Sequence, residues 1–150
     1  MAKTANARPV QSHTQPPPPA PWVHGRFHWN ELRTRDVERA KKFYQDTIGW
    51  KFERTSTPDG RAYWLALDKH KPVAGLFPLE GSQFDCVPES WMSFLAVDDV
   101  DVRVAKAVRS GAKLVMPIFD VPGVGRIAML MEPSGTGIGW MTPVGSMTKG

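Results

Sequence analysis

The chain has a single cysteine, Cys86, among its 150 residues. One cysteine cannot form an internal disulfide, so a fold held together by disulfides is excluded. This cysteine usage fits a reducing compartment, and we expect a cytoplasmic location. Cys86 is interpreted as a structural thiol and not as a nucleophile.

Long hydrophobic runs and clusters of basic residues are also absent. No stretch of about 18 apolar residues is present, the length that a membrane helix needs. The net charge is +4, but Lys3 and Arg8 lie in an acid-free N-terminal segment, which leaves 17 basic and 15 acidic residues elsewhere. No basic stripe with interleaved aromatic residues appears, so neither nucleic acid nor membrane is expected as a partner.

The first 23 residues are polar, show no periodicity and contain four consecutive prolines at 16–19. Such a run favours polyproline II and does not pack into a core. Residues 1–23 are therefore predicted to be a disordered Pro-rich tail. A Pro-rich ligand for an aromatic groove is the alternative interpretation of this segment.

The rest of the chain repeats one pattern twice. Asp36 is the predicted N-cap of one helix, and either Asp98 or Asp99 is that of a second. Both helices have apolar positions three and four residues apart, and Gly49 and Gly111 are predicted to end them. Turn residues separate the flanking segments of high strand propensity. The expected strands are 27–33, 50–56, 62–67 and 72–79, then 91–97, 113–119, 126–132 and 137–142.

This order predicts an α+β fold of two tandem βαβββ modules that form a curved mixed sheet around a concave cavity. Residues 24–144 form the domain, with module one at 24–80, module two at 90–144 and a short tail at 145–150. Each helix covers one face of its sheet, with Phe43 and Tyr44 expected in the core beneath the first helix. The other face is left as a largely apolar site for a small molecule.

Short sequence motifs then indicate a resemblance to a family. The segments that carry it are Trp29-Asn30-Glu31-Leu32, Ile48-Gly49-Trp50, Val97-Asp98-Asp99-Val100 and Glu132-Pro133-Ser134-Gly135. With the duplication, they resemble the vicinal oxygen chelate superfamily of glyoxalases, bleomycin-resistance proteins and extradiol dioxygenases. The resemblance covers residues 25–143 and is greatest to the glyoxalase-like or bleomycin-resistance-like branch. Glu132 stands where the family usually has aspartate.

The resemblance implies a divalent metal held by His and Glu side chains from the first and last strand of each module. We located the four positions that correspond to the family's metal ligands by their distance along the sequence from nearby motif residues. These positions hold Trp29, Gly75, Met92 and Gly139. None of these side chains is a hard-metal ligand. We therefore expect no divalent metal and no other cofactor, and we expect the two glycines to leave room in the cavity.

The predicted ligand-binding residues share the cavity face of their strands. They are Trp29, Glu31, Arg33, Phe77, Met92, Phe94 and Met141. The aromatic and thioether groups suit a planar or apolar ligand, with Glu31 and Arg33 orienting a polar group. The alternative is that the aromatic residues fill the core. Glu31 is the one candidate catalytic residue, as a general base.

The leading hypothesis is a protein that binds a small molecule without metal, similar in logic to the bleomycin-resistance proteins, and the resemblance implies a homodimer. The first alternative is a metal-dependent glyoxalase-like lyase/isomerase or dioxygenase with non-standard ligands such as Glu31. The second alternative is an interaction module recruited by its Pro-rich tail. The sequence leaves open whether a reaction is catalysed.

Overall fold

The computed structural model describes residues 19–148. The predicted disordered tail lies outside the described residues as far as residue 18. In the first module the elements are β2 (Phe27–Thr34), α1 (Val37–Ile48), β3 (Lys51–Ser56), β4 (Ala62–Asp68) and β5 (Lys71–Pro78). In the second module they are β6 (Ser90–Ala96), α2 (Val100–Arg109), β7 (Lys113–Leu114), β8 (Phe119–Val121), β9 (Gly125–Met131) and β10 (Gly137–Pro143). A short 3-10 helix (Ser82–Phe84) lies between the modules.

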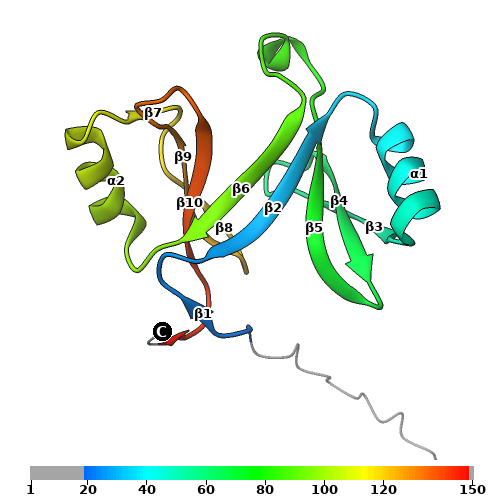
Figure 1. Ribbon diagram of the computed structural model, residues 1–150, viewed down its shortest axis with the longest axis horizontal. Coiled ribbons are helices and arrows are strands. Elements are labelled where there is room, and N and C mark those ends of the chain that lie inside the picture. Colours follow the sequence, from blue (N-terminus) through cyan, green and yellow to red (C-terminus); the bar gives the residue numbers. More distant parts are fainter. Residues whose placement is uncertain (1–18, 149–150) are drawn as a thin grey trace, which may run out of the picture.

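The strands form one curved mixed sheet in the order β3-β4-β5-β2-β6-β10-β9-β7, with β8 also paired to β9. Strands β2 and β6 are antiparallel neighbours and join the modules edge to edge. Figure 1 shows the result, with α1 and α2 at opposite ends and the first strand of each module side by side at the centre. The predicted fold of two βαβββ modules is confirmed.

Two parts of the chain differ from the expected elements. The strand expected at 113–119 is interrupted into β7 and β8, because Pro117 lies between them and has no N–H to donate to the ladder. In the segments expected as tails, β1 (Trp22–Val23) and β11 (Met147–Thr148) form a parallel pair. Trp22 is only 6% exposed, so the strand pair that joins the two ends of the described chain includes a buried side chain.

Both helices begin where the sequence predicts. The Asp36 carboxylate accepts a hydrogen bond from the Arg39 N–H at 2.9 Å, and the Asp99 carboxylate accepts one from the Val102 N–H at 3.0 Å. Each bond satisfies an amide of the first turn that has no partner within the helix. Gly49 ends α1 with a left-handed φ of 78°.

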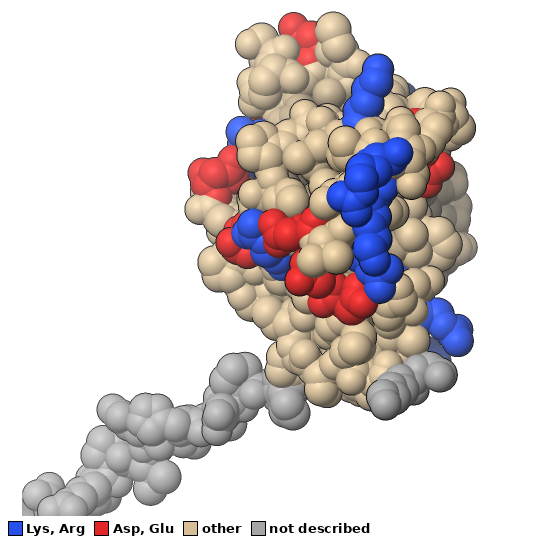
Figure 2. All heavy atoms as spheres, turned by 90° about the vertical axis from the view of Figure 1, so that its left-hand side faces the viewer, with Lys and Arg blue, Asp and Glu red and all other residues tan. Residues whose placement is uncertain are grey.

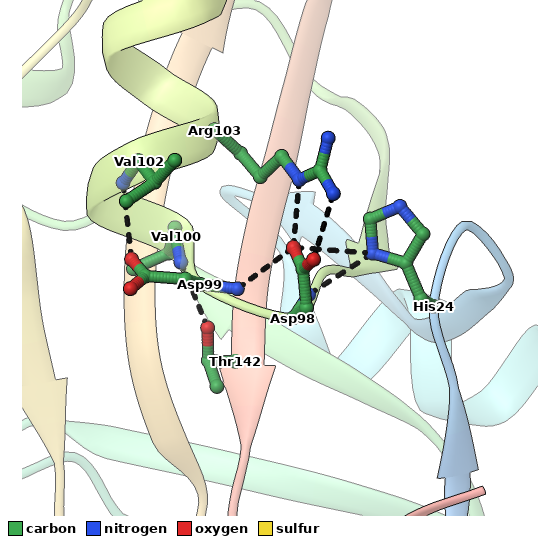
Figure 3. A network of polar contacts seen from close by, with 7 residues as sticks. All are labelled: His24, Asp98, Asp99, Val100, Val102, Arg103 and Thr142. Carbon is green, nitrogen blue, oxygen red and sulfur yellow. Dashed lines mark hydrogen bonds and ion pairs between the residues drawn. The ribbon is translucent and has the colours of Figure 1, made fainter. Parts of the chain in front are cut away.

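A polar network fixes the start of α2 (Figure 3). Asp98 accepts hydrogen bonds from Arg103 Nε at 2.6 Å and Nη2 at 2.7 Å, and its backbone N–H donates to His24 Nδ1 at 3.0 Å. The bonded Arg103 guanidinium holds the pKa of Asp98 well below its usual range. The Val100 N–H donates to Thr142 Oγ1 at 2.9 Å, which links the helix to β10. These contacts hold α2 against the second half of the sheet.

Three buried clusters divide the interior. The cluster under α1 contains Ala66, Ala74 and Leu76. The cluster under α2 contains Val97, Val100, Val104, Ala128 and Leu130. The third cluster lies on the opposite, concave face of the second module and contains Met92, Phe94, Ile127, Met129 and Met141.

One core prediction is wrong. Phe43 of α1 is 57% exposed, whereas Tyr44 beside it is half-buried and stacks on Trp50 with ring centroids 5.0 Å apart. No residue of α1 is fully buried, and Val37 and Ala40 are the helix residues that pack against the cluster beneath it. Phe43 therefore lies at the margin of the contact and not within it.

Candidate functional site

The concave face brings together side chains from both modules. Glu31 on β2 lies opposite Gly75 on β5 and opposite Met92 on β6. Gly139 on β10 lies opposite Phe94 on β6 and Met129 on β9. Since successive side chains of a strand point to opposite faces, this register puts all predicted ligand-binding residues on the concave face. They are Trp29, Glu31, Arg33, Phe77, Met92, Phe94 and Met141.

The second-module half of this face is apolar. Met92, Phe94 and Met141 are 7%, 6% and 2% exposed, and Trp29 packs against their cluster from the neighbouring strand β2. Thioether side chains are flexible and polarizable, so a wall rich in methionine adapts its shape to an apolar or aromatic surface.

The two glycines at the family's metal-ligand positions do not leave open space, contrary to expectation. A Cβ atom at Gly139 would overlap the Phe94 ring, and a Cβ atom at Gly75 would overlap the Tyr63 hydroxyl. Rings from neighbouring strands therefore occupy the volume that a ligand side chain would need. The expectation failed because alternation gives the direction of a side chain but not the reach of a ring on the next strand.

The first-module half of the face is polar. The Trp29 indole Nε1–H donates a hydrogen bond to the Tyr63 hydroxyl at 3.0 Å. Arg33 Nε approaches Glu31 Oε1 at 3.5 Å, and Arg33 Nη2 lies 3.8 Å from the Met129 sulfur. The Glu31 and Arg33 side chains are 13% and 19% exposed. Glu31 and Arg33 thus form a largely buried ion pair through one long contact. Both side chains can therefore make further hydrogen bonds.

Burial dominates the ionisation of this cluster. It raises the pKa of Glu31, and the opposing contributions of Arg33 and Tyr63 only partly offset it. Burial also raises the pKa of Tyr63, and the nearby Glu31 carboxylate acts in the same direction. Tyr63 therefore keeps its proton, and Glu31 is easier to protonate than an ordinary glutamate.

The raised pKa of Glu31 predicts a pH-dependent difference between the native protein and Glu31→Gln. Below the ordinary glutamate pKa, Glu31 is protonated in both the folded and the unfolded chain. Above that pKa, Glu31 loses its proton in the unfolded chain but keeps it in the folded chain. The unfolding free energy of the native protein relative to Glu31→Gln should therefore fall as pH rises through this window, then become constant above the folded-state pKa. Urea unfolding between about pH 4 and pH 8 measures this difference.

Glu53→Gln, the same change on the exposed strand β3, is the matched control. A difference between native protein and Glu31→Gln that stays constant, or that rises with pH, would contradict the raised pKa of Glu31.

The residues present do not fit the metal site that the resemblance implies. Trp29, Gly75, Met92 and Gly139 offer no carboxylate or imidazole, and Glu31 is the one carboxylate that we place in the polar cluster. Within residues 19–148, no group of three or more His, Cys, Asp or Glu side chains converges.

Two contributors to the face were missed by the sequence analysis, Tyr63 and Met129. Only side chains of the first and last strand of each module had been assigned to the concave face. Tyr63 alternates with Leu65, which pairs with Gly75, so projecting β4 as well would have placed it on the concave face. Phe77 on β5 lies opposite Arg33 on β2, and its ring centroid is 5.5 Å from that of Phe84.

Two cavities of ≈ 380 and ≈ 250 Å³ lie elsewhere on the molecule. The larger lies between α2 and strands β9 and β10, and the smaller lies at the start of α2. In the described part of the chain, no helix is long and apolar enough to cross a membrane.

Comparison with protein families gives one match. The model described as Glyoxalase/Bleomycin resistance protein/Dioxygenase superfamily matches residues 26–139. Among curated proteins, a putative glyoxylase, CFP32, of Mycobacterium tuberculosis is 34% identical over 116 residues, which are 77% of this chain and 44% of that protein. The anthracycline biosynthesis protein DnrV of Streptomyces peucetius is 26% identical over 118 residues, 71% of this chain and 43% of that protein. The chain thus spans less than half the length of these relatives.

Among solved structures, methylmalonyl-CoA epimerase from Mycobacterium tuberculosis matches with a TM-score of 0.58. The match covers 85% of this chain and 93% of the epimerase, at 18% sequence identity. At this identity the similarity establishes the fold.

Proposed function

The chain belongs to the Glyoxalase/Bleomycin resistance protein/Dioxygenase superfamily, and from that premise we propose that it binds a small planar or apolar ligand without a metal ion. The site is the concave face of the sheet. The observation that supports this most directly is the polar cluster of Trp29, Tyr63, Glu31 and Arg33 beside an apolar wall. In this cluster, Glu31 lies opposite Gly75 and Met92, two of the four positions at which the resemblance implies metal ligands.

The composition of the face indicates the chemistry of the ligand. Met92, Phe94 and Met129 offer an aromatic and thioether surface for a flat ring system. Tyr63 and Arg33 offer hydrogen-bond donors for an oxygen on that ring. A relative named for anthracycline biosynthesis supports this class of ligand, because anthracyclines are flat fused rings that carry oxygen substituents. A hydroxylated polycyclic ligand combines both features.

The polar cluster also supports a second candidate function, metal-free proton transfer. A buried carboxylate with a raised pKa, adjacent to a tyrosine hydroxyl, has the properties of a general base. In this role Glu31 would take a proton from a carbon acid, and the Tyr63 O–H would donate to the oxygen on which negative charge develops. A bound substrate that exchanges its proton for deuterium only when Glu31 is present would favour this candidate.

An exposed aromatic surface supports a homodimer as part of the proposal. Trp91 is 42% exposed and Phe43 and Ile48 are each 57% exposed. Trp91 donates its indole N–H to the Tyr44 hydroxyl at 3.1 Å, which fixes its ring at the edge of α1. Ordered, exposed aromatic side chains of this kind are common at subunit interfaces.

The proposed ligand class is tested with a matched pair of compounds, quinizarin and anthracene, which has the same three fused rings without oxygen. Quinizarin should bind more tightly, because its hydroxyl and carbonyl oxygens can pair with the polar cluster. Tyr63→Phe removes one hydroxyl and should weaken quinizarin binding by about tenfold, as expected for an unpaired polar group of 1–3 kcal/mol. The same variant should leave anthracene binding unchanged. Tryptophan fluorescence quenching measures both affinities.

Tyr44→Phe, which removes the corresponding hydroxyl on the opposite side of the sheet, is the matched control. Metal content after incubation with zinc, nickel, manganese or iron(II) is the second arm. Equal binding of the two compounds, or a loss of quinizarin affinity in Tyr44→Phe as large as in Tyr63→Phe, contradicts the assignment. Retention of about one metal ion per chain, lost in Glu31→Ala, would replace it by the metal-dependent class.

A further inference from the structure

The larger cavity lies on the opposite side of the sheet from the concave face. Its volume is ≈ 380 Å³, and it lies between the second half of α2 and strands β9 and β10. The apolar part of its lining comes from Ala107, Ala112, Leu130, Ile138 and Trp140. The cavity is therefore separate from the site proposed above and shares no residue with it.

The internal duplication shows what the first module has at the corresponding place. Tyr44 is the eighth residue after the N-cap of α1, and Ala107 is the eighth after the N-cap of α2. Trp50 follows Gly49, and Ala112 follows Gly111, each glycine having a positive φ. Tyr44 and Trp50 stack, with centroids 5.0 Å apart and ring planes at 27°.

The main chain closes both helices on the carbonyl of the corresponding helix residue. The Gly49 and Trp50 N–H groups donate to the Tyr44 carbonyl at 3.1 and 3.4 Å, and the Ala112 N–H donates to the Ala107 carbonyl at 3.0 Å. Two methyl groups in module two therefore stand where module one has two stacked rings. The cavity under α2 occupies the place of that aromatic stack.

One polar group of this cavity has no partner. The Nε1–H of Trp140 is buried and donates no hydrogen bond to any described residue. A buried donor without an acceptor is costly in a folded protein and is uncommon. Trp140 lines the cavity through other atoms of its side chain, because its Nε1 atom is itself buried, so a bound molecule can pack against the indole.

Three charged side chains line the cavity, and they are Arg103, Lys106 and Glu132. Arg103 is already paired with Asp98. Lys106 forms no ion pair with the residues that the structure describes. Figure 2 faces this side of the molecule and shows Lys and Arg side chains gathered in one line, with acidic side chains next to them.

We propose that the cavity under α2 binds a small planar aromatic anion. Its ring takes the place of the missing stack and packs against the Trp140 side chain, and its negative charge lies near Lys106. An aromatic carboxylate has both features. The volume suits a ligand of one or two fused rings.

The first test follows the tryptophan indole N–H signals of the ¹⁵N-labelled full-length chain in NMR spectra during titration with 2-naphthoate. Trp140→Phe assigns the Trp140 signal by its disappearance, and Trp29→Phe assigns a reporter for the concave face. We expect 2-naphthoate to shift the Trp140 signal and to leave the Trp29 signal in place. Neutral 2-naphthalenemethanol should bind at the same signal more weakly.

The second test refills the cavity. Ala107→Tyr with Ala112→Trp rebuilds the stack of module one and should abolish the shift of the Trp140 signal. Lys106→Gln should weaken naphthoate binding about two- to fivefold, the usual range for an exposed ion pair. Arg109→Gln, the same loss of charge on α2 at a residue that does not line the cavity, is the matched control.

Three results would overturn the proposal: an unchanged Trp140 signal at millimolar naphthoate, an undiminished shift in the refilled variant, or equal weakening by Lys106→Gln and Arg109→Gln. Movement of the Trp29 signal alone would assign naphthoate to the concave face instead. The titration of the native chain decides the matter even if the refilled variant does not fold.

Discussion

Phe94→Ala is expected to lower the free energy of unfolding by about 3–5 kcal/mol, among the largest effects of any single substitution in this chain. Phe94 is 6% exposed, belongs to the buried cluster of the concave face and covers Gly139 on the neighbouring strand. Removing the ring leaves a void bounded by Met92, Met129 and Met141. Urea unfolding followed by circular dichroism measures the loss.

Phe43→Ala makes the same chemical change at a side chain that is 57% exposed, so it should change stability by no more than about 0.5 kcal/mol. A loss in Phe43→Ala as large as in Phe94→Ala would show that exposure does not separate the two rings as described.

The contact between Phe94 and Gly139 is tested separately by a double-mutant cycle. Gly139→Ala places a Cβ atom within the Phe94 ring and should cost about 1–3 kcal/mol in the native background. In the Phe94→Ala background the ring is gone, and the added methyl group fills part of the void. The two changes should therefore be less costly together than the sum of each alone, by about 0.5–3 kcal/mol. Strict additivity would mean that the ring does not lie over Gly139.

The parts of the fold that depend on neighbouring residues in the chain were predictable from the sequence. Asp36 and Asp99 specify helix starts because a carboxylate at the N-cap bonds to the amide three residues later. Alternation along β2 and β6 likewise placed Glu31 and Met92 on the same face, since period-two patterns follow from strand geometry. The internal duplication then predicted that two similar modules form one curved sheet.

Other features depend on distances between strands, which the sequence does not contain. Gly75 was expected to leave space, but the Tyr63 ring reaches across from β4 and occupies it. Trp22 was placed in a tail, but it forms a strand with Met147, which is distant in sequence. Two-residue strands have no periodicity to detect. Phe43 fits the apolar stripe of α1, and its exposure depends on which helix residues contact the sheet below it.

The polar half of the concave face gives the second large expected effect, the loss of the ion pair between Glu31 and Arg33. Arg33→Met keeps the length of the side chain but removes its charge, which leaves the Glu31 carboxylate buried without its cation. Breaking a buried pair in this way costs roughly 3–5 kcal/mol. We expect the lower end of that range at about pH 8, because the N–O distance is 3.5 Å and the two side chains are 13% and 19% exposed.

Protonation of Glu31 decides how this cost depends on pH. Burial raises its pKa and Arg33 lowers it, so Arg33→Met should raise the pKa of Glu31 further. The variant then loses stability relative to the native protein as pH rises from about 4 to 8, and adding Glu31→Gln to Arg33→Met should restore part of the stability at the upper end. Urea unfolding of the native protein, Arg33→Met, Glu31→Gln and the double variant at both ends of this range measures these differences. A cost of Arg33→Met that is independent of pH would mean that water already solvates the Glu31 carboxylate. The concave face would then lack the buried polar group on which ligand recognition, as proposed, depends.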